Sequence, residues 1–225
     1  MKTKRIKSAF TMIELVFVIV ILGILASLAM GRMDRDLKQE ASESVLSHIR
    51  LTQQLAMRDN KHRSDNDVNW QTSYWQFSMQ RCGNDIAYMV ASDLNMAGGG
   101  ITGIGKTEAA INPVDGKYIY SSDCENLAKD ETPSVLLTQK YGIKNADVSF
   151  SGGCNRKQIL FDYLGRPHYR NTTYATATDT SPTFFNNIMT RDCDFTFKVG
   201  KDNDSFTIRI EAETGHAFIV GQEAS

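Results

Sequence analysis

The sequence predicts an α+β protein in which a long N-terminal helix, transmembrane in its first half, packs on a globular domain made of an antiparallel β-sheet or sandwich. Three observations lead to this prediction: an uninterrupted apolar run near the N-terminus, a helical apolar stripe after it, and short segments of period-two alternation over the rest of the 225 residues. The average composition, 41% hydrophobic and 23% charged, excludes a polytopic membrane protein and a fully disordered chain.

The first thirty residues differ from all that follow. Residues 1–9 form a basic leader without any acid, and residues 10–30 contain Glu14 as their single charge. A helix over residues 10–30 would be about 31 Å long, which matches the hydrocarbon core of a bilayer. The basic leader is expected to stay in the cytoplasm, so the residues after Met30 are expected to lie outside it.

Three interpretations of this segment compete. A cleaved secretory signal has an apolar run of about 7 to 15 residues, and the run here is longer. A plain single-pass anchor fits the length but does not explain Glu14, because a carboxylate in hydrocarbon costs about 2.5 to 3.5 kcal/mol even on insertion scales. Acids at such positions tend to be paired and functional, so the third interpretation starts from Glu14.

The segment Phe10-Thr11-Met12-Ile13-Glu14, preceded by a basic leader ending in Ala9, resembles the class III signal of type IV pilins and type II secretion pseudopilins. The resemblance implies cleavage between Ala9 and Phe10 by the prepilin peptidase and N-methylation of Phe10. It also implies that Glu14 meets the free amine of a neighbouring subunit and sets the register of assembly. The sequence departs from the family where Ala9 replaces the usual glycine.

Two glycines are expected to be points of flexibility in the membrane-proximal helix. Gly31 stands near the place where many relatives have a proline, and Gly23 lies inside the apolar run. Each costs about 1 kcal/mol of helix stability relative to alanine. They are therefore interpreted as sites where the helix could stretch or bend during assembly.

Residues 31–58 are predicted to continue the helix as an amphipathic segment. Apolar residues recur at spacings that fall on one helical face, and no proline interrupts them. This face consists of Met33, Leu37, Ala41, Val45, Ile49, Leu55 and Ala56, and His48 falls on it as a packing residue. We expect the C-terminal half to pack on the protein's own globular domain, residues 59–225, and the N-terminal half to contact other subunits.

The globular domain is predicted to be a series of short antiparallel strands separated by turns. Two strands are expected around the turn at Cys82-Gly83-Asn84, and a hairpin is expected at Ala212-Glu213-Thr214-Gly215. The predicted strands cover residues 74–79, 86–90, 117–121, 134–140, 147–150, 157–163, 195–199, 205–211 and 216–220.

Two segments of this domain resemble a particular subgroup of the pilin and pseudopilin family. Phe161-Asp162-Tyr163-Leu164-Gly165-Arg166-Pro167 resembles the F-D-x-x-G-R-P segment of H-type minor pseudopilins and FimT-like minor pilins. The closing segment from Ile208 to His216 resembles the hairpin that often ends those chains. The alternative for Gly165-Arg166-Pro167 is an ordinary turn that ends a strand.

All four cysteines follow the apolar run, in the compartment assigned as periplasm. An even number of cysteines in an oxidising compartment predicts two disulfides, and three pairings are open. We expect Cys82–Cys124 and Cys154–Cys193, because pairs that are near in sequence suit a meander. The spacings contain no C-x-x-C, so zinc binding and redox catalysis have no support.

No cofactor, metal or catalytic arrangement is indicated, and the chain is not expected to be an enzyme. The segment from Gly100 to Thr107 fits the phosphate-loop pattern, but it lacks the preceding strand and the following helix that phosphate binding needs. We interpret it as a Gly-rich surface loop. The oxygen-rich stretches 65–69 and 202–204 lack the glycine and distal glutamate of a calcium-binding helix–loop–helix.

Two functions remain in view. The first is a minor pseudopilin or pilin-like structural subunit, with other pilins, the prepilin peptidase and the inner-membrane assembly platform as partners. The alternative is a DNA-binding minor pilin for uptake, with a basic patch that would consist of Arg166, His168, Arg170 and Arg191. The leader holds four of the 25 basic residues and none of the 26 acidic ones, so the rest has a net charge of −5 and disfavours nucleic acid as a partner.

Overall fold

The computed structural model describes residues 11–59, 73–94, 104–154, 157–169, 187–200 and 204–222, and within the first helix it describes the backbone but not the side chains of residues 28–36. The chain divides into two compact units, Met1–Leu37 and Lys38–Ser225. Helix α1, Met12–Arg58, begins in the first unit and ends in the second. This agrees with the single long helix predicted from Phe10 to Arg58, although Phe10 itself lies outside the described residues.

In the first unit, every described side chain from Thr11 to Ser27 is exposed. Among the helices of the described residues, none meets the combined requirement of length and apolarity for crossing a membrane. The membrane span predicted for residues 10–30 is therefore not confirmed.

The second unit contains two four-stranded sheets, and every strand pair in them is antiparallel, as predicted. The first sheet has the order β2-β1-β4-β5, with β1 at Trp75–Cys82, β2 at Asp85–Ser92, β4 at Gln158–Phe161 and β5 at Pro167–His168. The second has the order β3-β6-β7-β8, with β3 at Val148–Gly152, β6 at Cys193–Val199, β7 at Asp204–Ile210 and β8 at Ala217–Ile219.

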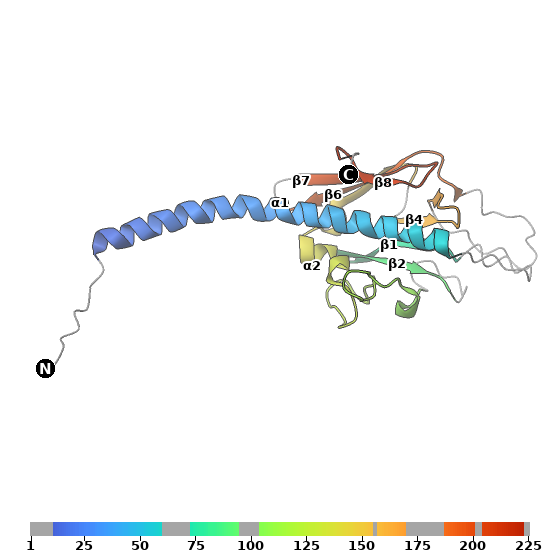
Figure 1. The fold of residues 1–225 in the computed structure, drawn as a ribbon, viewed down its shortest axis with the longest axis horizontal. Coiled ribbons are helices and arrows are strands. Elements are labelled where there is room, and N and C mark those ends of the chain that lie inside the picture. The colour runs from blue at the N-terminus through green and yellow to red at the C-terminus, as the bar shows by residue number, and fades with distance from the viewer. Residues whose placement is uncertain are drawn as a thin grey trace, which may run out of the picture. The chain divides into compact units, whose positions relative to one another are not determined.

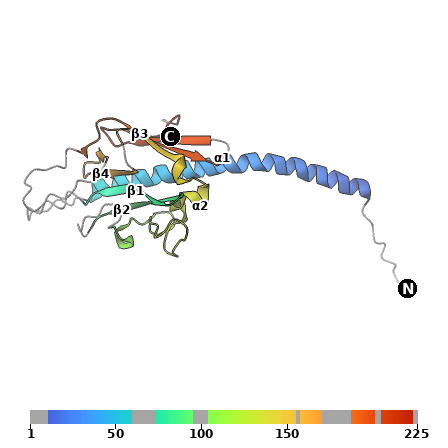
Figure 2. The same ribbon diagram turned by 180° about the vertical axis from the view of Figure 1, so that it is seen from behind.

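Residues 38–58 of α1 lie against one face of these sheets. In Figure 1 the helix runs in front of the strands, and in the reverse view of Figure 2 strands β1 to β4 lie in front of it. The side chains of Ala41, Val45, Ile49 and Ala56 are buried, as the predicted stripe requires. The two sheets meet beneath the helix through an aromatic contact between Phe77 of β1 and Phe195 of β6, whose ring centroids are 6.5 Å apart.

The segment between β2 and β3 is mostly irregular, and it corrects two strand predictions. Residues 134–140 are helical instead of extended: the short helix η4 covers Pro133–Val135 and α2 covers Leu137–Tyr141. Pro133 stands in the first turn of η4, and Gly142, with a left-handed φ of 70°, ends α2. Residues 117–121 form only isolated bridges, through Tyr118. Two further short helices are η3, Lys106–Glu108, and η5, Asn145–Asp147.

Candidate functional site

The first unit has a large exposed apolar surface, which indicates that it contacts a partner. Twelve large hydrophobic side chains of α1, from Met12 to Leu25, are between 48% and 89% exposed. They surround the helix on all sides, whereas a soluble helix exposes a polar face. Exposed apolar surface on this scale marks contact with a membrane or another protein.

Glu14 lies at the start of this surface, and the structure gives it a local contact. The backbone N–H and the hydroxyl of Thr11 both point to its Oε2, each at 3.4 Å, and the N–H of Glu14 donates to the carbonyl of Thr11 at 3.1 Å. A threonine followed three positions later by a glutamate is the capping-box arrangement of a helix N-terminus. The structure shows half of this arrangement, because the Glu14 side chain accepts the N–H of Thr11 while the Thr11 hydroxyl donates to the same carboxylate. Glu14 therefore has a local contact at the start of α1 as well as a charge, and sequence reasoning missed this contact.

The other N-terminal predictions are only partly covered by the described residues. Ala9 and Phe10, the predicted cleavage and methylation positions, lie outside them. Gly23 and Gly31 both lie inside α1, and the helix continues through both. No atom lies within 4 Å of the position that a Cβ at Gly23 would occupy, so nothing in the described residues requires glycine there for space.

A second arrangement is the turn after β4, which the buried carboxylate of Asp162 organises. Its Oδ1 accepts the N–H groups of Leu164 and Arg166, each at 2.9 Å, and its Oδ2 accepts Nε of Arg166 at 2.8 Å. Nε2 of His168 lies 3.3 Å from the same Oδ2. Burial alone would raise the pKa of Asp162, but the hydrogen bonds from His168 and Arg166 outweigh burial and lower this pKa below its usual range.

This turn meets the C-terminal hairpin on helix α1. Nε2 of Gln53 donates to the carbonyl oxygens of Gly165 and Thr214, at 2.9 and 2.8 Å. Gly165 and Gly215 both have left-handed backbones, with φ of 77° and 68°. A Cβ at Gly215 would collide with the carbonyl of Gly165, so the two turns can approach this closely only because residue 215 has no side chain.

The two segments that resemble H-type subunits thus form one junction, held to the helix by Gln53. Nε of Arg50 adds a bond of 2.9 Å to the carbonyl of Ala217 in the same hairpin. Sequence reasoning found both segments but assigned no role to Asp162 or Gln53. A polar residue next to the apolar stripe, such as Gln53, was the available signal.

Two of the residues predicted to form a DNA-binding patch are engaged within the turn after β4. His168 is buried, with 1% of its side chain exposed, and it stacks on Tyr74 with 5.2 Å between ring centroids. The guanidinium of Arg166 is bound to Asp162, so its charge is offset by a buried carboxylate. Arg191 is exposed, and Arg170 lies outside the described residues. Of the three residues that the structure describes, His168 and Arg166 are thus held by Asp162, and only Arg191 offers the exposed, unbridged charge that phosphate binding requires.

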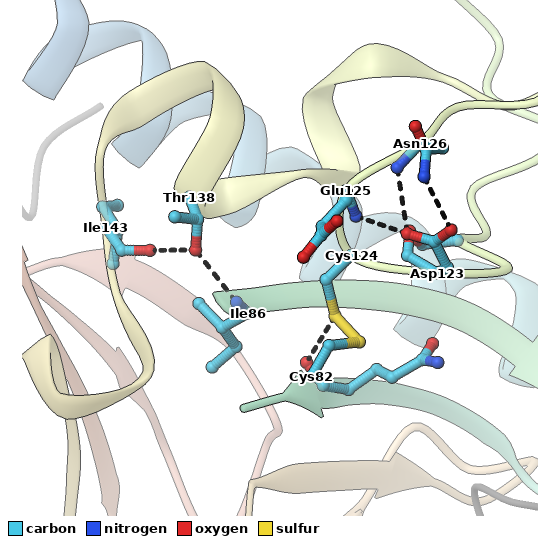
Figure 3. Close-up of a disulfide and its surroundings, with 10 residues drawn as sticks. Cys82, Ile86, Asp123, Cys124, Glu125, Asn126, Thr138 and Ile143 are labelled. Carbon is cyan, nitrogen blue, oxygen red and sulfur yellow. Dashed lines mark hydrogen bonds between the residues drawn. A yellow bond between two sulfur atoms is a disulfide. The ribbon is translucent and has the colours of Figure 1, made fainter. Parts of the chain in front are cut away.

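The cysteines form Cys82–Cys124 and Cys154–Cys193, which is the pairing expected from the sequence. The first disulfide fixes the irregular segment after β2 to the end of β1 (Figure 3). Beside it, the carboxylate of Asp123 accepts the N–H groups of Glu125 and Asn126, and the hydroxyl of Thr138 joins the N–H of Ile86 to the carbonyl of Ile143 (Figure 3). The irregular segment is thus held by covalent and polar links.

His48 packs inside the protein, as the sequence predicted. Only 5% of its surface is exposed, and its Nδ1 is 2.7 Å from the hydroxyl of Tyr88 on β2. Burial lowers the pKa of His48 to about 4, and a hydrogen bond with Asn112 and the charge of Asp115 only partly oppose this. The histidine is therefore neutral near pH 7 and forms a polar link between α1 and the first sheet.

The phosphate-loop resemblance does not correspond to an open phosphate site in the described part of that segment. Nζ of Lys106 is 2.8 Å from Oδ1 of Asp130 and 3.6 Å from Oε1 of Glu131. The lysine that would bind phosphate therefore already forms ion pairs with two carboxylates. Residues 100–103 lie outside the described residues, as do the oxygen-rich stretches at 65–69 and 202–203. In the described ranges, no group of three or more histidine, cysteine or acidic residues is arranged to hold a metal ion.

A comparison with known protein families gives a match at the N-terminus. Residues 4–30 match the prokaryotic N-terminal methylation motif. Comparisons with curated proteins and with solved structures give no significant match. The matched region includes Ala9, Phe10 and Glu14, and it suggests other pilins and the prepilin peptidase as partners. The motif thus supports a place for this chain in the type IV pilin and pseudopilin family, and it indicates a pilin-like subunit.

Proposed function

We propose that this chain is a minor pseudopilin or pilin-like structural subunit of a type II secretion or type IV pilus-like machine. In this proposal residues 10–30 anchor it in the bacterial inner membrane, and residues 59–225 lie in the periplasm. The prepilin peptidase removes residues 1–9 and methylates Phe10, and an inner-membrane assembly platform then moves the subunit into a periplasmic or surface fibre. The proposal includes no enzymatic activity.

The observation that carries the proposal is the methylation motif followed by a helix with apolar side chains on all sides. A helix that only covered its own domain would need one apolar face. An all-round apolar surface suits a segment that lies first in lipid and then among the helices of a fibre. The acidic side chain of Glu14 within this surface supports assembly in particular, because a carboxylate in an apolar medium is stabilised by a positive partner.

The globular unit supports a structural role through its internal connections. Lys38 binds Asp204 at 2.6 Å, and Lys140 binds Glu40 at 2.5 Å, so both ion pairs tie the C-terminal half of α1 to its domain. Gln53 adds a third link, because its side chain bonds to the carbonyls of both turns, at Gly165 and Thr214. A domain fixed to its helix in this way moves with it during assembly. We also propose that the chain belongs to the H-type minor pseudopilins, because the junction is built from the two segments that resemble them.

Substitutions at the capping box can separate the charge of Glu14 from its helix-capping role. Glu14→Gln keeps the capping geometry, since glutamine serves in a capping box as glutamate does, but it removes the charge. Thr11→Ala removes the hydroxyl that donates to the Glu14 carboxylate and keeps the charge. We expect Glu14→Gln to abolish incorporation into fibres while Thr11→Ala retains most of it, with both variants processed to the same mature N-terminus.

The measurement is the fraction of mature chain in sheared or detergent-resistant fibres, compared with the membrane pool. Equal incorporation of Glu14→Gln and wild type would contradict the assembly role of this charge. Loss of incorporation in Thr11→Ala alone would show that assembly needs the local contact between Thr11 and Glu14 and not the charge of Glu14.

A further inference from the structure

We propose that the outer edge of β3 accepts an extended segment of a partner subunit as an added antiparallel strand, with an acidic residue of that segment bound to Arg191. The inference rests on the proposed function, because it names a contact through which an assembly subunit would hold a neighbour. It concerns the globular unit and is separate from the apolar helix.

The register of β3 shows that half of its backbone groups face away from the sheet. The strand is the last in the order β3-β6-β7-β8, and the N–H of Gly153 donates to the carbonyl of Asp192 at 2.7 Å. In an antiparallel ladder the bonded pairs alternate, so Ser149 and Ser151 bond to β6 while Phe150 and Gly152 turn their N–H and C=O groups outward. Within the described ranges, no backbone or side-chain group bonds to these outward groups of Phe150 and Gly152.

Two other sheet edges, at β2 and β8, have contacts from other parts of the described chain. At β2, the backbone of Val90 exchanges hydrogen bonds with Ile119 and Ala110, at 3.0 and 2.8 Å, and the hydroxyl of Thr138 accepts the N–H of Ile86 at 2.9 Å. At β8, Arg50 occupies the carbonyl of Ala217. Proteins protect free edges with such covers, or with charged residues and prolines. The strand β3, with the sequence Val-Ser-Phe-Ser-Gly, has no charge and no proline.

The edge is also held in a fixed conformation, which lowers the cost of binding. Phe150 packs edge-on against Phe195 with ring centroids 4.8 Å apart, and the disulfide Cys154–Cys193 fixes the chain just after the strand. Ser149, Ser151 and Gly152 are exposed, so solvent reaches this side of the sheet. Little conformational entropy would be lost when a second strand pairs with it.

A cleft of about 280 Å³ continues from the C-terminal end of the edge. Gly152, Gly153, Tyr169, Thr190 and Arg191 contribute to its lining. The neighbouring acids are engaged elsewhere: Asp192 accepts the N–H of Ala212 at 3.0 Å, and Asp194 holds Arg209 through two bonds of 2.8 Å. Arg191 is exposed and forms no ion pair with an acid in the described part of the chain, and a carboxylate is the complementary group.

The size of the feature indicates an extended segment and not a second globular face. Five residues of strand edge bury far less than the roughly 1,200 Å² of a stable interface between folded subunits. Strand addition instead draws its affinity from main-chain hydrogen bonds and from a few side-chain contacts. Every other pair in this sheet is antiparallel, which places the acidic residue toward the N-terminal end of the added segment.

The test uses the full chain in detergent micelles and an N-acetylated probe peptide of one glutamate followed by alternating threonine and valine. NMR-detected hydrogen exchange gives the readout. We expect the peptide to slow exchange at Phe150 and Gly152 by about tenfold or more and to leave Ser149 and Ser151 unchanged, because those two N–H groups already bond to β6. Slowing that is equal at all four residues, or absent, would overturn the proposal.

Three variants sharpen the test. Ser151→Lys places a charge beside the edge and should abolish the effect, whereas Ser205→Lys, on the exposed side of β7, should not. Arg191→Gln should weaken binding of this peptide about tenfold but leave a glutamine-for-glutamate peptide unaffected. If Ser151→Lys binds as wild type does, the edge is not the site.

The outcome is distinguishable from failure of the proposed function. A chain that is processed, methylated and incorporated into fibres, but whose Phe150 and Gly152 show no selective protection, would retain the assembly role and lose the strand-addition site. A chain that is not processed, yet shows the alternating protection, would retain the site and lose the fibre role.

Discussion

The burial of His48 should make the protein lose stability as the pH falls from 6.5 to 4. The imidazole is neutral in the folded state, with its pKa lowered to about 4, whereas in the unfolded chain the pKa returns to 6.5. Between these values the unfolded state binds a proton that the folded state does not bind. Stability is therefore complete above pH 6.5 and decreases as the solution becomes more acidic.

The magnitude follows from the difference between the two pKa values. One pH unit in this window removes about 1.4 kcal/mol of unfolding free energy, and the whole window removes about 3 kcal/mol. Typical domains have about 5 to 15 kcal/mol in total, so the loss is large enough to measure. His48→Gln keeps an amide near the hydroxyl of Tyr88 but cannot titrate.

The assay is urea unfolding of the full chain in detergent, followed by tryptophan fluorescence at several pH values from 4 to 7. Carboxylates also titrate in this range, so the quantity of interest is the difference in pH slope between wild type and His48→Gln. The exposed His216 provides the matched control, and His216→Gln should keep the wild-type slope. An unchanged slope in His48→Gln would refute the reasoning from burial.

Three further results are expected from other parts of the globular unit. Cys82 and Cys124 are 42 residues apart, and replacing both with serine should lower the unfolding free energy by about 4 kcal/mol, measured by urea unfolding. An unchanged urea midpoint would show that this disulfide does not constrain the unfolded chain. Gly215→Ala should lower the unfolding free energy by about 3 kcal/mol, because its φ is left-handed and the new Cβ would collide with Gly165. Gly83→Ala, with a similar φ and open surroundings, should lower it by only about 1 kcal/mol. Equal shifts of the thermal midpoint in the two variants would rule out the close contact. Asp162→Asn should lower stability by about 3 kcal/mol near pH 7, because Arg166 and His168 lose a buried charged acceptor; a thermal midpoint equal to wild type would argue against that role.

Much of the fold could be predicted because the chain alternates in simple periods. The stripe from Ala41 to Ala56 predicted the buried face of α1, and alternation predicted β1, β2, β6 and β7 close to their observed bounds. The segment 134–140 was predicted wrongly, because a short apolar run has no period that separates strand from helix. Pro133 and Gly142 decide the outcome there through local backbone preferences.

The candidate functional residues also differ in whether the sequence alone could identify them. Glu14 could be singled out from the sequence because its motif is local, and its role in assembly stays a prediction. In the predicted basic patch, charge along the chain does not show where a counter-charge lies: Asp162 binds Arg166 and His168 through the fold of a turn. The free edge of β3 could not be predicted either, because it depends on which strands pair with it.

The central claim is that this chain is a processed pilin-like subunit, and the most direct measurement is the N-terminus and intact mass of the membrane-extracted protein with and without the prepilin peptidase. We expect a chain that starts at methylated Phe10 when the peptidase is present and keeps residues 1–9 when it is absent. Retention of residues 1–9 in the presence of an active peptidase, one that processes another pilin in the same cells, would contradict it.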